Sequence, residues 1–346
     1  MLACHFSSGL GNQMCEYAEM LAYKKMNPNQ KVYIEDINYH IKQNAISMWN
    51  GYELDRVFGI KEPFLGEFFS NEQWQSIIDE VQESRFWADG GWNCGPVFVE
   101  AFKHQGLDMI NLCQSRRWAD KEQQGKPTVR SLVKTILGRQ SVPVRNMYWR
   151  IRLIAQKEEE FGIIEDNGNY LCGGFLKYMY KKSGMRFVEQ EVRKAFTFKE
   201  IDDEKNKMAL DLIQSTNSVS VHIRRGDMLG PNSDFYKYGY FKKAIRYILT
   251  RVQAPCFFFF GTQSDLEWCQ KNKVALFGER MNTCQAYYID WNTGKNSFRD
   301  MQLMSNCKHN IITRTSFGWW GSYLNPNPYK ITICPDVLFD TTVTIS

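Results

Sequence analysis

Residues 219–227 read Val-Ser-Val-His-Ile-Arg-Arg-Gly-Asp, an apolar strand pattern that ends in a polar turn. Side chains alternate along a strand, so His222 and Arg224 lie on the same face. The guanidinium of arginine pairs bidentately with phosphate oxygens, and we therefore expect Arg224 to contact a diphosphate at the carboxyl end of this strand. Arg225 and Asp227 are open to two interpretations: they contact the same ligand, or they pair with each other and hold the turn.

The residues after this turn predict the fold of the C-terminal half. Apolar residues recur at three- and four-residue spacings over 241–252, which is typical of an amphipathic helix. Short apolar strands alternate with helical stretches and predict a parallel, doubly wound sheet with right-handed crossovers. The expected strands are Val219–Ile223, Cys256–Phe260, Ala286–Ile289, Asn310–Thr313 and Ile331–Cys334.

The N-terminus begins in the same way. A strand over Leu2–Phe6, a glycine-rich turn, a helix over Gln13–Met26 and a strand over Lys31–Ile37 predict a second α/β layer. Two such layers in one chain favour a ligand site in the cleft between two domains, at the carboxyl ends of the strands.

A chain of 346 residues is long enough for two domains. We predict an N-terminal α/β domain over residues 1–205 and a C-terminal, Rossmann-like ligand-binding domain over 206–346. The charged, helical pattern over 186–214 is expected to connect them. Residues 50–165 show no regular pattern, and we expect an irregular or helical insertion there.

The run Gly9-Leu10-Gly11-Asn12-Gln13 directly follows the first expected strand. Glycines let the backbone approach a ligand, and a helix N-terminus favours anions, so this turn is a second candidate for ligand contact. The alternative is a tight turn that only packs. The dinucleotide-binding fingerprint requires glycine where Met14 stands, which argues against an NAD enzyme.

The run Thr315-Ser316-Phe317 opens another strand-to-helix turn. Its hydroxyls and backbone amides are a further candidate grip on phosphate. We assign the following pair, Trp319 and Trp320, to the core rather than to a sugar platform. Asp300, on the preceding helix, either contacts a nucleobase or caps that helix.

Charge and cysteine usage exclude several classes of protein. The chain carries 43 Lys and Arg against 38 Asp and Glu, a net charge of +5 that fits an anionic small molecule or membrane surface better than duplex binding. Residues 116–157 hold eleven of the basic residues and two acidic ones, which predicts a solvated helical face or a surface that meets anionic lipid.

Ten scattered cysteines without a Cys-x-x-Cys pair predict buried, reduced thiols.

No signal peptide or membrane-spanning run is visible, so we expect a cytoplasmic protein, free or peripheral at the inner membrane face. The sequence contains no Asp-x-Asp pair, no zinc-like histidine spacing, no P-loop and no nucleophile elbow. We therefore expect no metal and no cofactor, with arginine and helix N-termini stabilising a leaving diphosphate.

Three motifs together resemble a known family. The runs Gly9–Met14, His222–Asp227 and Asp300–Asn325 occur in the same order in α-1,2-fucosyltransferases of glycosyltransferase family 11. The stretch Leu303–Ile312 is similar nearly residue for residue, whereas 50–165 matches poorly. The His-x-Arg-Arg-Gly-Asp motif is shared with α-1,6- and protein O-fucosyltransferases, so the C-terminal stretch narrows the resemblance to α-1,2 transfer.

The resemblance implies a GT-B fold of two facing Rossmann-like domains, GDP-β-L-fucose as donor, and inverting transfer to O2 of a terminal β-galactose. It implies that Arg224 holds the β-phosphate and supports departure of GDP, while His222 and Asp227 shape that pocket. The donor-binding residues that it implies are Gly11, Asn12, Gln13, Arg225, Asp265, Asp300, Thr315, Ser316 and Phe317.

Inverting transfer also requires loss of the proton of the acceptor hydroxyl. Asp227 and Glu16 are the candidate bases, and a dissociative route with little base assistance is the alternative. The expected partners are GDP-fucose and a galactoside-terminated surface glycan, free or lipid-linked, and no nucleic acid. A GDP-fucose transferase of different linkage, or a non-enzymatic carbohydrate-binding protein, are the alternative functions.

Overall fold

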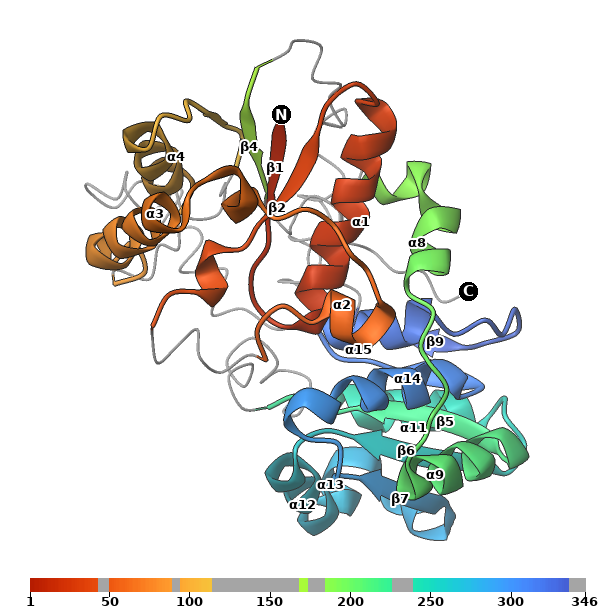
Figure 1. Ribbon diagram of the computed structural model, residues 1–346. Helices are drawn as coiled ribbons and strands as arrows, with labels where there is room; N and C mark the ends of the chain where they lie inside the picture. The colour runs from red at the N-terminus through yellow and green to blue at the C-terminus, as the bar shows by residue number, and fades with distance from the viewer. Residues whose placement is uncertain (43–49, 89–93, 114–167, 174–183, 226–238, 336–346) are drawn as a thin grey trace, which may run out of the picture. The chain divides into compact units, whose positions relative to one another are not determined.

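The computed structural model describes residues 1–42, 50–88, 94–113, 168–173, 184–225 and 239–335. The chain divides into two compact units, Met1–Ala195 and Phe196–Ser346, and each contains a parallel sheet (Figure 1). The expectation of an α/β fold with two Rossmann-like domains is confirmed. The basic run 116–157 and Asp227 lie outside the described residues.

The first unit is built on a four-stranded sheet in the order β2-β1-β4-β3. β1 pairs in parallel with β2 on one side and with β4 on the other, which places the topological switch point of this sheet between β1 and β4. β3 and β4 were not predicted, because strands of two or three residues show no periodicity. The strands are β1 (Leu2–His5), β2 (Val32–Glu35), β3 (Ile110–Asn111) and β4 (Tyr170–Cys172).

Helices surround this sheet. α1 begins three residues before the predicted Gln13, directly after Gly9. Phe98 and Phe102 of α4 pack with Ile77 and Val81 of α3 in one buried cluster, and the described part of the predicted insertion contains helices and the short strand β3. The helices are α1 (Leu10–Met26), η1 (Ile37–Tyr39), α2 (Leu54–Phe58), η2 (Leu65–Phe68), α3 (Asn71–Ser84), α4 (Gly95–His104), η3 (Gly184–Phe187) and α8 (Glu189–Ala195).

The second unit contains a five-stranded parallel sheet in the order β7-β6-β5-β8-β9. All five predicted strands are confirmed, with ends shifted by up to two residues. Their order is that of a doubly wound sheet, whose switch point lies between β5 and β8. The strands are β5 (Asn217–His222), β6 (Pro255–Phe260), β7 (Gln285–Ile289), β8 (His309–Ile311) and β9 (Thr332–Ile333).

The core of the second unit centres on β6, whose four consecutive phenylalanines are fully buried. A parallel sheet covered on both faces produces such unbroken apolar strands. Phe257 and Phe259 join the cluster that includes Phe241 of α11, while Phe258 stacks on Tyr287 of β7. The helices are α9 (Glu204–Ser215), α11 (Tyr240–Leu249), α12 (Gln263–Lys271), α13 (Lys273–Phe277), η5 (Glu279–Thr283), η6 (Gly294–Asn296), α14 (Phe298–Asn306) and α15 (Ser316–Tyr323).

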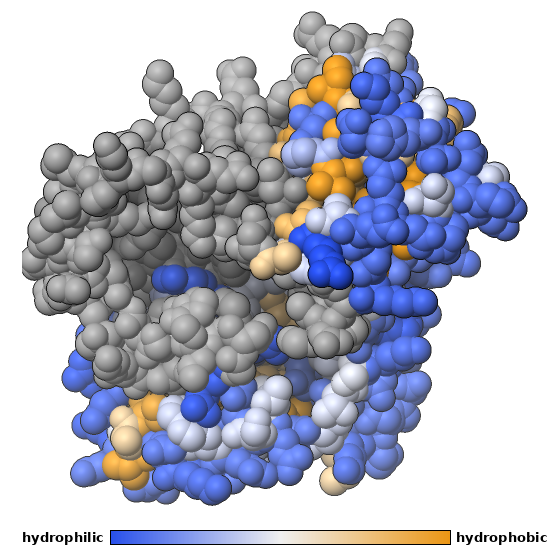
Figure 2. Space-filling view, turned by 90° about the vertical axis from the view of Figure 1, so that its left-hand side faces the viewer, coloured by the Kyte–Doolittle hydropathy of each residue, from blue (hydrophilic) through white to orange (hydrophobic). Residues whose placement is uncertain are grey.

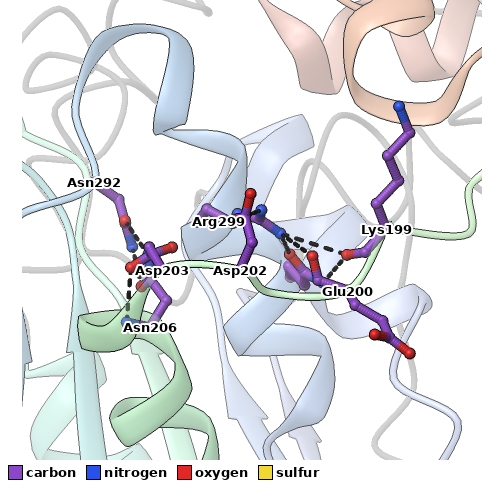
Figure 3. A network of polar contacts seen from close by, with 8 residues as sticks. Lys199, Glu200, Asp202, Asp203, Asn206, Asn292 and Arg299 are labelled. Atoms are coloured by element: carbon purple, nitrogen blue, oxygen red, sulfur yellow. Dashed lines mark hydrogen bonds and ion pairs between the residues drawn. The ribbon is translucent and has the colours of Figure 1, made fainter.

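The boundary between the units differs from the predicted one because α14 holds the segment before α9. Arg299 of α14 donates hydrogen bonds to the carbonyls of Lys199 and Glu200 and pairs with Asp202 at 2.6 Å (Figure 3). These contacts attach the segment to the second unit. Sequence periodicity could not reveal them, since the segment itself is neither helix nor strand.

The described surface carries both hydrophilic and apolar side chains. The face shown in Figure 2 is mainly hydrophilic over the described residues, with hydrophobic side chains gathered over the first unit. Exposed apolar side chains of that unit include Phe68 and Ile110, which are 51% and 54% exposed.

All ten cysteines are free thiols and seven are buried. In the part of the chain that the structure describes, no helix has the length and apolarity needed to span a membrane.

Replacing Arg299 with Met should lower the free energy of unfolding by about 2–4 kcal/mol, because the Glu200 carbonyl and the buried side-chain oxygen of Gln302 lose their charged donor. Urea denaturation measures this. The control is Asp202→Asn, whose side chain is 87% exposed, and we expect it to change stability by less than about 1 kcal/mol. Equal effects of the two substitutions would contradict the assignment of Arg299 as the anchor.

Candidate functional site

His222 ends β5 at the switch point of the second sheet. Its Nδ1 lies 3.1 Å from the hydroxyl oxygen of Thr313 and 3.5 Å from that of Thr315. Burial, with a smaller contribution from the charge of Arg224, lowers the pKa of His222 to about 3. The imidazole is therefore neutral near pH 7, and it adds no charge beside Arg224.

The N-terminus of α15 lies against this histidine. Thr315 caps the helix, because its hydroxyl oxygen accepts a hydrogen bond from the backbone N–H of Gly318 at 3.1 Å. A Cβ on Gly318 would lie 2.7 Å from Nδ1 of His222, so only glycine permits this approach. The Phe317 ring lies 5.9 Å from the imidazole. The structure thus brings His222 together with the run that starts at Thr315 and Ser316.

Arg224 and Arg225 follow β5, and both are partly exposed. The backbone N–H of Arg225 donates to Asp265 at 3.2 Å, and its guanidinium lies 3.7 Å above the ring of Trp268. Arg225 therefore holds the turn after β5 onto α12. Asp265 is thus a partner of Arg225 within the described residues, and the predicted pairing with Asp227 lies outside them. Donor contacts of Arg225 and Asp265 stay predictions.

Asp300 lies in a buried polar network. The amide of Asn292 donates to Asp300 at 2.8 Å and to Asn206 at 3.0 Å, and Figure 3 shows the two asparagines facing each other. Burial raises the pKa of Asp300 well above its usual range, Asn292 opposes this, and nearby Asp290 reinforces it. Asp300 thus binds the loop before its own helix, and its contact with a nucleobase stays a prediction.

The tryptophan pair divides between two environments. Trp320 is fully buried and lies edge-on to Phe196 at 5.0 Å between ring centroids, so its assignment to the core is confirmed. Trp319 is partly exposed and stacks on Tyr323 at 4.8 Å.

In the first unit, the side chain of Gln13 stabilises the glycine-rich turn that precedes α1. This side chain is fully buried; its amide donates to the carbonyls of Ser8 and Gly51, and its oxygen accepts from the backbone N–H of Glu53. Gln13 therefore supports the turn with its side-chain amide, and its contact with the donor stays a prediction.

The N-terminus of α1 already holds a carboxylate. Glu53 is 2% exposed, interacts with the backbone of Leu10 and pairs with Arg56. Burial raises its pKa, and Arg56 opposes the shift. A phosphate at this helix end would meet that negative charge. Gly11 is buried and Asn12 is partly exposed, and their contact with the donor stays a prediction.

A second titratable cluster follows β1 and β2. Nδ1 of His5 lies 2.5 Å from Glu35, and both oxygens of Glu16 accept hydrogen bonds from Ser7. Burial raises the pKa of Glu16 to about 8, against the opposing charge of His5. The sequence analysis named Glu16 but missed His5 and Glu35. Their signal was a polar residue at the carboxyl end of each of the first two strands.

The described residues contain no group of three or more His, Cys, Asp or Glu side chains placed to hold a metal ion.

Comparison with known proteins gives a family match and partial relatives. The model of glycosyl transferase family 11 matches residues 137–342, more than half of the chain. An alpha-1,2-colitosyltransferase of Escherichia coli is 36% identical over 157 residues, covering 44% of this chain and 51% of that protein. A galactoside alpha-(1,2)-fucosyltransferase 1 of Saimiri sciureus is 25% identical over 195 residues, covering 53% and 50%. The chain spans about half the length of the curated relatives it matches.

Among solved structures, the fucosyltransferase NodZ from Bradyrhizobium aligns with a TM-score of 0.42 and 11% identity, over 94% of this chain and 93% of that one. A mutant of Arabidopsis thaliana FUT1 in complex with GDP aligns with a TM-score of 0.44 and 10% identity, over 96% and 70%.

The NMR signals of the His222 imidazole should not titrate between pH 4.5 and 8, because burial keeps this ring neutral. Exposed His104, whose pKa the carboxylate of Glu80 raises, is the internal control and should titrate. A midpoint near 6.5 for His222 would contradict the neutral, buried assignment.

Glu16→Gln should flatten part of the pH dependence of stability. The folded chain keeps the Glu16 proton up to about pH 8, whereas the unfolded chain releases it near 4.5, so wild-type stability declines across this range. The amide of the variant can keep both bonds to Ser7. We expect the variant to gain about 2–4 kcal/mol on wild type between pH 5 and 9.

Denaturation at a series of pH values measures this difference. Glu83→Gln on the exposed face of α3 is the matched control and should leave the pH dependence unchanged. A Glu16→Gln profile parallel to wild type would refute the raised pKa.

Proposed function

The chain belongs to glycosyltransferase family 11, and we propose that it transfers L-fucose from GDP-β-L-fucose to O2 of a terminal β-galactoside with inversion at the anomeric carbon. The proposed acceptor is a galactoside-terminated surface glycan, free or lipid-linked. The membrane contact proposed for 116–157 lies outside the described residues.

One observation carries the proposal: a partly exposed Arg224 lies at the switch point of a doubly wound sheet, where such sheets bind nucleotides. His222 beside it is neutral, so the positive charge at this strand end comes from the arginines that follow it. The capped N-terminus of α15 is adjacent and directs its positive end to the same point. The guanidinium of Arg224 and the backbone N–H groups at the N-terminus of α15 could together bind the two phosphates of GDP.

In the proposed reaction the acceptor oxygen attacks the anomeric carbon of fucose as the bond from that carbon to the β-phosphate oxygen breaks. The electron pair leaves with GDP, and the proton of the acceptor hydroxyl passes to a general base or to water. Arg224 stabilises the charge that develops on the leaving phosphate. A positioned donor of this kind contributes about 10²–10³ to kcat, and the proposed reaction needs no metal ion.

The named relative raises one question about the donor. Colitose is fucose without the 3-hydroxyl, and the partial relative from Escherichia coli is named as a colitosyltransferase. GDP-fucose and GDP-colitose carry the same diphosphate and differ only at C3 of the sugar. Contacts of Arg224 and α15 with the diphosphate therefore suit either donor. We propose fucose as the donor and make colitose an arm of the test.

The test incubates the protein with lactose and either GDP-fucose or GDP-colitose in EDTA, and follows GDP release and the linkage of the product. We expect α-1,2-fucosyl-lactose. Arg224→Ala should reduce kcat by about 10²–10³ because the leaving phosphate loses its cation. Arg246→Ala, on the exposed face of α11, is the matched control.

Each alternative predicts a different outcome. Fucose on another hydroxyl would establish a transferase of different linkage. Lactose binding without GDP release from either donor would favour a carbohydrate-binding protein. Near-normal turnover by Arg224→Ala would contradict the proposal that Arg224 contacts the leaving phosphate.

A further inference from the structure

The backbone stays extended for three residues beyond the last residue of β5. The N–H of Ile223 donates to the carbonyl of Phe260 at 2.8 Å and so continues the ladder with β6. Two residues further on, the N–H of Arg225 donates to the carboxylate of Asp265 at 3.2 Å, where a longer β6 would supply a carbonyl. Alternate N–H groups therefore point to the same side, as they do in a parallel strand.

This extended backbone places the two adjacent arginines on opposite faces of the second sheet. Side chains alternate along an extended chain, so Arg224 shares a face with His222. Burial, and after it the charge of Arg224, lowers the pKa of that histidine, which agrees with a common face. Arg225 shares the other face with Ile223, which packs in one buried cluster with Cys269 of α12.

Helix α12 contacts both the backbone and the side chain of Arg225. Asp265 and Trp268 lie one turn apart on this helix and so share one of its faces. Asp265, which is 5% exposed, accepts the backbone N–H, and the guanidinium lies 3.7 Å from the centre of the Trp268 ring. Gly261 permits this approach, because a Cβ there would lie 2.9 Å from the carbonyl oxygen of Ile223.

The ring of Trp268 sets the position of the Arg225 guanidinium. Nε of Arg225 is buried and has no hydrogen-bond partner among the described residues. A terminal nitrogen of the same group lies 3.9 Å from Asp265, which is a long ion pair, and 22% of the side chain is exposed. A guanidinium over an indole face is attracted by the ring, and the attraction grows as water is removed.

These contacts limit the movement of Arg224. Its peptide bond to Arg225 is planar, so a turn that α12 fixes at Arg225 also fixes the backbone of Arg224. On the opposite face, Thr313 holds the ring of His222 at 3.1 Å. Such restraint matters for catalysis, since a misplacement of about 1 Å can cost about 10² in rate.

We propose that Trp268 is a positioning residue for the diphosphate site: it holds Arg225 against α12 and thereby fixes Arg224 where the diphosphate binds. Arg225 supports its neighbour and does not contact the diphosphate. The part that this plays in fucose transfer rests on the proposed function.

The test is a double-substitution cycle on the full chain, with calorimetry of GDP binding and with kcat for GDP-fucose and lactose. We expect Trp268→Leu and Arg225→Met each to weaken GDP binding and lower kcat about tenfold. The double variant should lose no more than either single one, because both substitutions remove the same contact. Trp268→Phe keeps a ring face under the guanidinium and should stay within about threefold of wild type.

The matched control is Tyr247→Leu. Arg251 lies 3.6 Å over the ring of Tyr247 on α11, and this ring packs against the same core as Trp268. The control should bind GDP and turn over as wild type does. Equal losses in this variant would identify general destabilisation of the core and overturn the positioning role.

Other outcomes separate this inference from the proposed function. Wild-type GDP binding by Trp268→Leu overturns the inference. Effects that multiply in the double variant, with a far larger loss for Arg225→Met, would show that Arg225 binds the phosphates directly and would also overturn it. GDP binding that depends on Trp268, in a protein that forms no fucosyl product, would refute the proposed function and leave the positioning role standing. A wild type that does not bind GDP would overturn both.

Discussion

Parallel pairing of β5 between β6 and β8 is the constraint on which the site around His222 and Arg224 depends. Both neighbours satisfy the backbone groups of β5, and its side chains are buried from Ser218 to His222. A strand enclosed in this way can offer a ligand only the residues beyond its carboxyl end. The chain places Arg224 there, shortly after a histidine that burial keeps neutral.

The approach of α15 to that histidine requires glycine and two hydroxyl groups. Gly318 permits the helix to come within contact of the imidazole, and Thr313 and Thr315 occupy Nδ1. The consequence is a rigid junction between the end of β5 and a helix N-terminus. Rigid donors add more to catalysis than mobile ones, because they need no reorganisation when charge develops on the leaving group.

Both sheets are parallel and have a switch point, but the charges beside the two switch points differ. In the second unit the switch point presents a cation and a helix N-terminus. In the first, Glu53 already occupies the N-terminus of α1 and Glu35 neutralises His5. The local charge at the two switch points therefore differs, because buried side chains set it in each unit.

The sequence by itself determined the strands of the second sheet, the parallel topology and the cluster around His222, since strand periodicity and strand-end motifs are local signals. Tertiary structure alone decided the inward turn of Gln13, the pairing of Arg225 with Asp265 and the contact of His5 with Glu35. Each joins residues from different elements, at separations of 30 to 40 positions. The domain boundary has the same cause: Arg299 reaches across about 100 positions to hold the segment before α9. The periodicity of apolar residues along an element indicates which of its faces is buried. It does not indicate which side chain from a distant part of the chain contacts that face.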